Sequence, residues 1–93
     1  MDTSLRRQAE RILKGAANHR RIQILLLLQE KRCLSLFAIQ DLTAASRQAV
    51  CEHTRRLALA GLIRKRYRGR EVHHTLAPLG HRILGFLPNL LAP

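Results

Sequence analysis

The stretch that decides the fold is residues 46–76, which read SRQAVCEHTRRLALAGLIRKRYRGREVHHTL. Ser46 is suited to the N-cap of a helix over residues 47–60, because a serine hydroxyl can accept a hydrogen bond from a free backbone amide. The inner face of this helix is predicted from the apolar spacing of Val50, Thr54 and Leu57. Gly61 ends it, and the period then changes to two short strands, residues 62–67 and 70–76, around Arg68-Gly69. The stretch therefore predicts a helix followed by a β-hairpin.

The residues before this stretch predict a second helix and a tight connection to it. Three elements are expected there: a helix capped by Asn18 and reaching about Glu30, an extended piece at Cys33-Leu34, and a brief helix capped by Ser35 that carries Leu36 and Ile39. Apolar residues on more than one face place the first of these helices in the core, where Cys33 is also expected as a small hydrophobic residue. Residues 43–45 form a tight break. A short helix, a tight turn and the helix from Ser46 make a helix-turn-helix, whose second helix can enter a DNA major groove.

Two amphipathic helices, residues 4–14 and 78–90, flank this unit within a single domain of residues 1–93. Gly15 is predicted to end the first; Pro78 suits the first turn of the last helix, and Pro88 is predicted to stop it. We expect their apolar stripes to pack across a two-fold axis in a homodimer, with Gly80 and Gly85 permitting close approach. The alternative is that both stripes complete one chain's core. The predicted dimerisation residues are Leu5, Ile12, Leu13, Leu79, Ile83, Phe86 and Leu87.

Charge is the strongest compositional signal. The 93 residues include 17 Lys and Arg against 6 Asp and Glu, a net charge of +11. Such a balance indicates a polyanionic partner, either nucleic acid or an anionic membrane surface. The 46% hydrophobic content is too high for a disordered basic tail, and the 3% aromatic content argues against a binder of single strands, which needs stacking platforms.

The positive charge is concentrated on the decisive stretch. Residues 47–70 hold eight basic side chains and one acidic one, for a net charge of +7, whereas the other 69 residues carry +4. The charge thus lies on the helix from Ser46 and on the following hairpin, which could grip phosphates or reach a minor groove. The alternative is a solvated, charged helix and turn in a small basic protein.

The sequence also excludes several classes. Two cysteines do not make a disulfide framework, the longest apolar run, residues 24–28, is far too short to span a membrane, and no apolar segment follows the N-terminus. We therefore expect a cytoplasmic protein with reduced thiols and no membrane partner. No Gly-rich phosphate loop, catalytic carboxylate pair or nucleophile–base group is visible, so we expect no enzyme activity and no cofactor.

These features resemble the arsenic-repressor-like (ArsR) family of bacterial winged helix-turn-helix regulators over about residues 17–76. Residues 17–25 resemble the opening of the family's second helix, with Arg21 at the usual arginine. Residues 46–57 resemble its recognition helix, and residues 60–63 and 69–76 resemble its helix end and wing. Residues 76–84 are more similar to the winged helices of the MarR and HxlR types. The resemblance implies a mainly α fold with a small β-hairpin, DNA binding and dimerisation.

Several positions depart from the family pattern. Thr54 stands where a leucine is usual, and Leu42 lies one place from the expected apolar position. Metal-sensing members carry a Cys-x-Cys where this chain has Ser35 and Phe37, and their second metal site has no counterpart because residues 77–90 offer only His81. The resemblance therefore does not imply a metal sensor.

The candidate DNA-binding residues lie on the predicted recognition helix and wing: Ser46, Arg47, Gln48, Cys51, Glu52, Arg55, Arg64, Arg66, Arg68 and Arg70. Arg47 could read guanine and Gln48 adenine, each through two hydrogen bonds. Glu52 could accept from cytosine or only pair with Arg55 or Arg56 at helical spacing. Arg56 could instead lie along the hairpin as a packing stem. The wing arginines are candidates for phosphate or minor-groove contacts.

The cysteines and histidines admit other functions. Cys51 lies near a helix start among arginines and could sense oxidants, although small-residue packing or a base contact is the simpler reading. His73 and His74 are adjacent on a strand and so point to opposite faces, which leaves a zinc site only across a dimer. His53 is expected to be structural.

The sequence thus predicts a homodimeric regulator that binds specific double-stranded DNA sequences and represses transcription. It leaves any effector open. One alternative is a winged-helix adaptor or architectural protein that binds RNA, DNA or protein without operator specificity. The other is a sensor switched through Cys51 or a metal.

Overall fold

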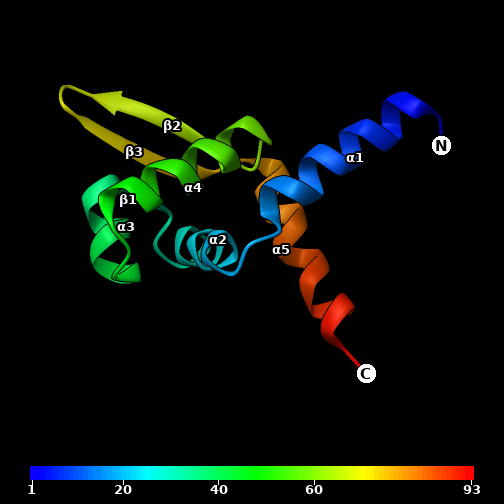
Figure 1. Ribbon diagram of the computed structural model, residues 1–93. Coiled ribbons are helices and arrows are strands. Elements are labelled where there is room, and N and C mark those ends of the chain that lie inside the picture. The colour runs from blue at the N-terminus through cyan, green and yellow to red at the C-terminus, as the bar shows by residue number, and fades with distance from the viewer.

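A computed structural model describes residues 1–93 as a winged helix-turn-helix with five helices and a three-stranded sheet (Figure 1). In chain order the elements are α1 (Thr3–Ala16), α2 (His19–Lys31), β1 (Cys33–Ser35), α3 (Leu36–Thr43), α4 (Arg47–Leu59), β2 (Ile63–Arg68), β3 (Glu71–Leu76) and α5 (Pro78–Leu91). The body is formed by α2, α3, α4 and the sheet, and α1 and α5 project from it in different directions (Figure 1). The predicted element order is confirmed.

The helix starts are determined by local capping. The side chains of Asn18, Ser35 and Ser46 accept hydrogen bonds from backbone amides two or three residues further on, as the sequence predicts. Asp2 caps α1 in the same way through Leu5 N at 2.8 Å. Each cap satisfies amides that the first turn of a helix leaves free.

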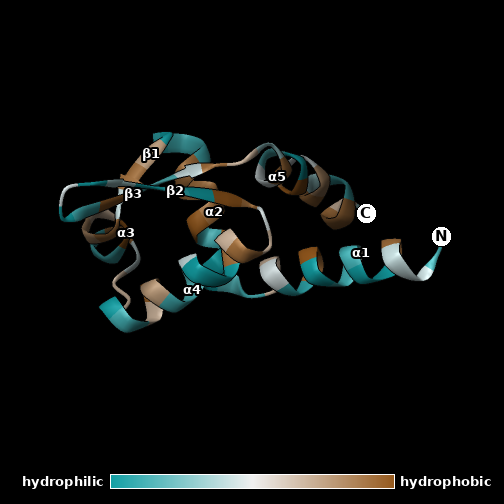
Figure 2. Ribbon diagram, turned by 90° about the horizontal axis from the view of Figure 1, so that it is seen from above, coloured by the Kyte–Doolittle hydropathy of each residue, from teal (hydrophilic) through white to brown (hydrophobic).

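The hydrophobic core lies where α2 meets α3, α4 and the sheet. Its fully buried side chains include Ile24, Leu25, Leu28, Ile39, Val50, Leu57 and Leu62. Figure 2 shows the hydrophobic residues gathered on α2 and on the surfaces that face it. The central position predicted for α2 is confirmed.

Two threonines occupy core positions, and the hydroxyl of each donates to a backbone carbonyl of its own helix. Thr54 is 0% exposed, and its hydroxyl donates to Val50 O at 2.8 Å; Thr43 is 3% exposed and donates to Ile39 O at 2.7 Å. Each hydroxyl is satisfied by its own helix, so threonine fits where a leucine is usual. Leu42, one position from Thr43, is largely exposed.

The sheet is antiparallel with the strand order β1-β3-β2. The predicted hairpin is present, but its turn is Gly69-Arg70 rather than Arg68-Gly69, because Arg68 pairs with Glu71. Gly69 has φ +59°, the left-handed conformation that the first central residue of a type II′ hairpin turn requires. The extended piece at Cys33-Leu34 joins the hairpin as its third strand.

Two glycines lie at close contacts within the chain. The prediction that Gly15 ends the first helix is wrong: α1 continues through it, and a Cβ there would collide with the Ala60 side chain of α4. The prediction that Gly80 serves a dimer contact is also not supported, because a Cβ on Gly80 would collide with the Leu62 carbonyl oxygen of the same chain. Gly85 faces open space.

The last helix passes through Pro88, so the prediction that Pro88 stops it is wrong. A proline lacks an amide donor, so one carbonyl a turn earlier loses its partner within the helix, and Pro88 lies close to the C-terminal end of α5. The following amides still find acceptors, and Ala92 N donates to Pro88 O at 3.0 Å. The helix therefore continues to Leu91.

Cys33 is exposed, so its prediction as a core residue is wrong. Successive residues of a strand point to opposite faces, and in β1 the inward position belongs to Leu34, which is 9% exposed. The prediction that His73 and His74 point to opposite faces is confirmed: His74 is in the core, and His73 is on the outer face.

Candidate nucleic-acid interface

The first turns of α4 present a polar face to solvent. Arg47, Gln48, Cys51, Glu52 and Arg55 are all exposed, together with the capping residue Ser46. On the opposite face Val50, Thr54 and Leu57 are 0% exposed. Core packing therefore fixes the direction in which the predicted base-reading side chains point, and the structure brings all six onto one surface.

Glu52 is held by two arginines of its own helix. Arg55 donates from Nε to Oε2 at 3.0 Å and from Nη2 to Oε1 at 2.8 Å, and Arg56 donates from Nε to Oε1 at 2.9 Å. The hydrogen bonds from Arg55, and then those from Arg56, lower the pKa of Glu52 to about 2. Glu52 thus pairs with both arginines in the free protein, and its contact with cytosine stays a prediction. Arg56 bonds to Glu52, and the structure does not place it along the hairpin as a packing stem.

The wing carries arginines on one face of its strands. In β2, Arg64, Arg66 and Arg68 alternate with inward positions and pair across the ladder with Thr75, His73 and Glu71. All three arginines are exposed, as is Arg70 in the turn. Lys65 and Tyr67 point to the other face, the one that holds buried His74, and Tyr67 is 74% exposed because it lies beyond the core.

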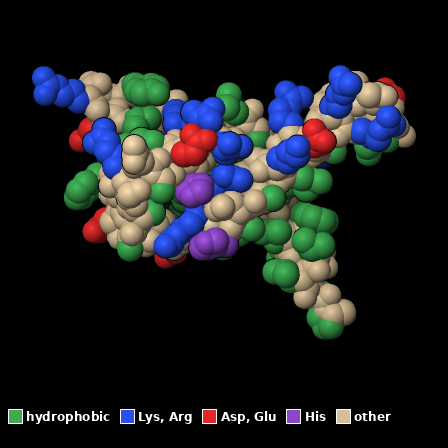
Figure 3. Space-filling view, in the orientation of Figure 1, with side chains coloured by type: hydrophobic (Ala, Val, Ile, Leu, Met, Phe, Trp, Pro, Cys, Tyr) green, Lys and Arg blue, Asp and Glu red, His purple; other side chains and the backbone are tan.

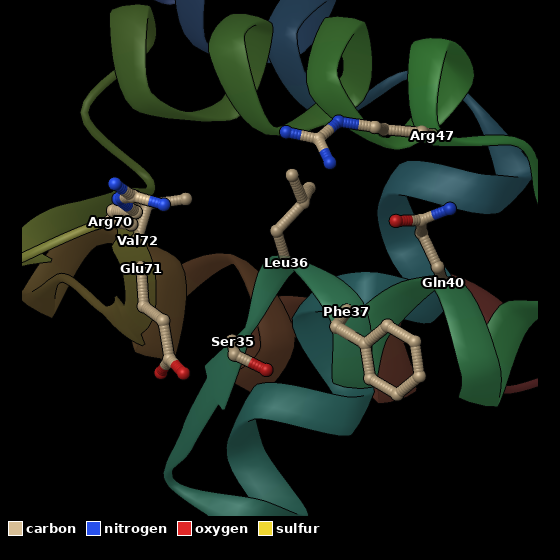
Figure 4. A pocket seen from close by; sticks show the side chains of 8 residues that line it. All are labelled: Ser35, Leu36, Phe37, Gln40, Arg47, Arg70, Glu71 and Val72. Atoms are coloured by element: carbon tan, nitrogen blue, oxygen red, sulfur yellow. The ribbon is translucent and has the colours of Figure 1, made fainter.

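A cleft of about 350 Å³ separates the start of α4 from the wing tip. Its walls come from α3, α4 and the turn after β2, and Figure 4 shows Arg47 reaching from α4 toward Leu36 while Arg70 lies at the opposite side. Arg47 therefore leans over this cleft in the protein without DNA. The lining of the cleft includes two cations, Arg47 and Arg70, and one carboxylate, that of Glu71.

Phe37 borders this cleft and is 78% exposed. It was not among the predicted site residues and stands where metal sensors carry a cysteine. Its exposure could have been inferred from helical spacing, since Leu36 and Ile39 take the buried face of α3.

The basic surface extends from α4 onto α1. Figure 3 shows Lys and Arg side chains over both helices on the face that it displays. A groove of about 360 Å³ between them is lined in part by Arg11, Lys14, Arg55 and Arg56. Arg11 and Lys14 were not among the predicted site residues, although both lie off the apolar stripe of their helix.

Arg21 and His53 lie beneath this surface. Arg21 donates from Nη2 to Lys14 O at 3.2 Å, which ties α2 to α1. Arg21 Nε and His53 Nδ1 are buried without a hydrogen-bond partner. Burial, and then the charge of Arg21, lowers the pKa of His53, so its neutral form is favoured and its expected structural role is consistent with this setting.

The predicted dimerisation residues divide into two groups. Leu5, Leu13 and Phe86 are 49%, 56% and 49% exposed, whereas Ile12, Leu79, Ile83 and Leu87 pack in part against the core. An apolar hollow of about 140 Å³ between α1, α2 and α5 includes Leu13, Ile83, Phe86 and Leu87. Core completion is therefore visible for the second group, and packing across a two-fold axis stays a prediction for the first.

The structure brings together no group of three His, Cys, Asp or Glu side chains suited to a metal ion. None of its helices has the length and apolar character needed to cross a membrane.

The fold is similar to several solved regulators of transcription. HlyU from Vibrio cholerae is 28% identical, with 98% of each chain covered and a TM-score of 0.83. A possible transcriptional regulator for arsenical resistance is 31% identical, with 84% of this chain and 80% of that chain covered and a TM-score of 0.72.

A third similar structure is the homodimeric winged helix-turn-helix DNA-binding domain of a possible ArsR-family transcriptional regulator from Mycobacterium bovis. It is 27% identical, with 95% of this chain and 81% of that chain covered and a TM-score of 0.80. No family model matches the chain, and no curated protein matches it either.

Proposed function

Because the chain belongs to the ArsR-like winged helix-turn-helix regulators of transcription, we propose that it binds operator DNA as a homodimer and represses transcription. The observation that carries the proposal is the set of exposed arginines on α4 and on the wing, with Arg47 and Arg70 lining the cleft between these elements. The cytoplasm is the compartment in which such a protein would meet its operator.

Base reading is assigned to the start of α4. Arg47 and Gln48 follow the Ser46 cap directly and are exposed. They lie at the N-terminal end of α4, and in this class of domain the N-terminal residues of this helix contact base edges in the major groove. Arginine suits the two acceptors of guanine, and glutamine suits adenine. Arg47 would leave its position over the cleft to reach a base edge.

Phosphate binding is assigned to the remaining cations. Arg64, Arg66, Arg68 and Arg70 on the wing and Arg55 on α4 would contact backbone oxygens on either side of the groove. Such contacts fix the register of the helix on the duplex, although they carry no sequence information themselves. The Ser46 hydroxyl already caps Ala49 N at 3.1 Å, so its role is to order the helix start beside the DNA.

Dimerisation is assigned to the outward apolar faces of α1 and α5. Leu5, Leu13 and Phe86 are about half exposed, and the hollow beside them is lined only by hydrophobic residues. A second copy of the same surface would remove these side chains from water, and two-fold pairing is the commonest way for a protein to do so. Two recognition helices would then reach major grooves about one helical turn apart, on an imperfect palindrome.

Repression is the simplest effect on transcription of a protein that occupies an operator, because its presence there excludes other proteins.

The experiment is selection of bound fragments from a pool of random duplexes, followed by fluorescence anisotropy with the selected and a scrambled duplex. Arg47→Ala and Gln48→Ala should each reduce the preference for the selected sequence by about 5- to 150-fold, the loss of one two-bond base contact. Arg82→Ala is the matched control, since Arg82 is exposed on α5, away from α4 (Figure 2), and should leave the preference intact. Unchanged preference in both α4 variants would contradict the assignment, and equal affinity for random duplexes and RNA would favour an adaptor.

Dimerisation is tested separately by sedimentation equilibrium. The wild-type protein should have twice the 10.6 kDa mass of the chain, and Phe86→Ser should shift it toward the monomer. A wild-type monomer at micromolar concentration, in the presence of the selected duplex, would overturn the dimer.

A further inference from the structure

The outer face of the sheet brings together a thiol, an imidazole and a carboxylate from β1 and β3. Cys33 pairs with Thr75 and Ser35 pairs with His73, so Cys33 and His73 lie diagonally across the two strands and point to the same side. Cys33 Sγ is 3.8 Å from His73 Nδ1, and His73 Nε2 is 3.0 Å from Glu71 Oε2. Cys33 is exposed, and 23% of the His73 side chain remains accessible.

The order of the three groups indicates a proton relay rather than a metal site. The two ring nitrogens of His73 face different partners: Nδ1 faces the thiol, and Nε2 faces the carboxylate. A single metal ion therefore could not contact the ring, the thiol and the carboxylate at once. With Glu71 accepting from Nε2–H, the lone pair of Nδ1 faces the thiol of Cys33. A nucleophile, a base and a group that orients the base are the parts of an activated nucleophile.

Two arginines of β2 lie on the same face of the sheet as Cys33. Arg66 pairs with His73 across the β2–β3 ladder. Arg64 pairs with Thr75 in the same ladder, and Thr75 pairs with Cys33 of β1 on its other edge. A cationic, solvent-accessible setting is the one in which cysteines react with disulfides.

Cys51 provides a contrast. It is also an exposed thiol, on α4, but no imidazole or carboxylate is hydrogen-bonded to its sulfur in the structure. The chain therefore contains one exposed cysteine with a relay and one without.

We propose that Cys33 is a modification site that exchanges with small disulfides of the glutathione type, with His73 as the base and Glu71 as its positioning residue. The thiol proton passes to His73 Nδ1, and Cys33 Sγ forms a bond to one sulfur of the disulfide. The disulfide bond breaks, and the second sulfur leaves as a thiolate that takes up a proton from the imidazolium. Cys33 is oxidised to a mixed disulfide, and the departing sulfur is reduced, so no other oxidant is needed.

The adduct would sit beside the wing. A glutathione-type group is bulky and anionic, and it would lie on the face that carries Arg64 and Arg66. It is expected to weaken the phosphate contacts of these arginines, a consequence that rests on the proposed function. The reactivity of Cys33 does not rest on it.

The reactivity is measured in the Cys51→Ser protein, where Cys33 is the only thiol, with an aromatic disulfide whose released thiolate absorbs visible light. At pH 7 an ordinary thiol is only about 3% ionised, so full activation gains at most about 30-fold, of which the lower nucleophilicity of a stabilised thiolate removes part. We expect Cys33 to react roughly tenfold faster than in the Cys51→Ser/His73→Gln protein. The advantage should vanish above about pH 9, where ordinary thiols are ionised without help.

Glu71→Gln tests positioning, because it should shift the rate–pH profile and lower the rate less than His73→Gln. Circular dichroism confirms that each variant is folded. Equal rates with and without His73, or a rate no greater than that of the same thiol in urea, would overturn the modification site.

The link to DNA is tested with oxidised glutathione on the Cys51→Ser protein, using mass spectrometry to confirm the adduct. A loss of affinity for the selected duplex supports the link, and unchanged affinity of the fully modified protein overturns it. Absence of DNA binding by the unmodified wild-type protein would refute the proposed function, while the exchange rate would still decide the site.

Discussion

The double ion pair of Glu52 leads to a prediction of unusual sign: removing this residue should strengthen DNA binding. One carboxylate accepts three hydrogen bonds from Arg55 and Arg56 at 2.8 to 3.0 Å, so both guanidinium groups are occupied in the free protein. Glu52→Gln keeps the size of the side chain and one amide oxygen, but it removes the negative charge. Both arginines then become available to phosphates, and the repulsion between Glu52 and the DNA disappears.

The size of the effect follows from counterion release. Each additional phosphate contact steepens the slope of log affinity against log salt concentration by about 0.9, so two freed arginines add up to about 1.8 per protomer. Between about 0.3 M and 0.1 M salt, this amounts to roughly a sevenfold extra gain in affinity per protomer. The assay is fluorescence anisotropy of a labelled duplex at several salt concentrations, for wild type and Glu52→Gln.

The control for this experiment is Glu30→Gln, which removes an exposed carboxylate at the end of α2 and the same unit of charge. It should leave the slope unchanged. A weaker affinity of Glu52→Gln with an unchanged slope would refute the reasoning, because it would mean that Glu52 contacts a base or holds the arginines in their binding positions.

Three further predictions concern stability and the helix start. Gly80→Ala should lower the free energy of unfolding by about 1–3 kcal/mol in urea titrations, because its Cβ would meet the Leu62 carbonyl. Gly85→Ala, in open space, should raise the free energy of unfolding by up to about 1 kcal/mol. Equal effects of the two substitutions would contradict the close contact at Gly80. Burial lowers the pKa of His74, so the free energy of unfolding should be highest above pH 6.5. Below that pH it should fall by up to about 1.4 kcal/mol per pH unit for this proton. His74→Asn should flatten this dependence in urea titrations between pH 7.5 and 5. An unchanged slope would count against His74 as its source. Ser46→Ala should lower the free energy of unfolding in urea titrations by about 1 kcal/mol, because the helix cap is lost. Ser46→Asp should keep that stability but weaken DNA binding in the anisotropy assay. A Ser46→Ala protein as stable as the wild type would contradict the role of the cap.

The elements that the sequence predicts correctly are those set by local chemistry. Asn18, Ser35 and Ser46 each cap a helix with their own side chain, and the distance between a cap and its amide is only two or three residues. The exposed face of α4 is predictable in the same way, because the period of its apolar residues determines which side is buried.

The errors concern residues whose role depends on a distant part of the chain. Gly15 looks like a helix end and Gly80 like a dimer contact. In the structure a Cβ at Gly15 would collide with the Ala60 side chain, and a Cβ at Gly80 would collide with the Leu62 carbonyl, which explains why glycine is present at both positions. Pro88 looks like a terminator, yet the helix continues through it to Leu91.

The candidate site was predicted residue by residue but not as an arrangement. Helical spacing suggests that Glu52 can meet Arg55 or Arg56, but only the structure shows that it binds both. The contact between Cys33 and His73 joins residues 40 positions apart, through a strand pairing that no local pattern specifies.

The most direct test of the central claim is the salt dependence of binding to a selected duplex. If the basic surface of α4 and the wing holds DNA phosphates, log affinity should fall linearly with log salt, and the variant Arg64→Gln/Arg66→Gln should reduce the slope by up to about 1.8 per protomer, while Arg82→Gln leaves it unchanged. No binding at low salt, or a slope that the wing variant does not alter, would contradict the account.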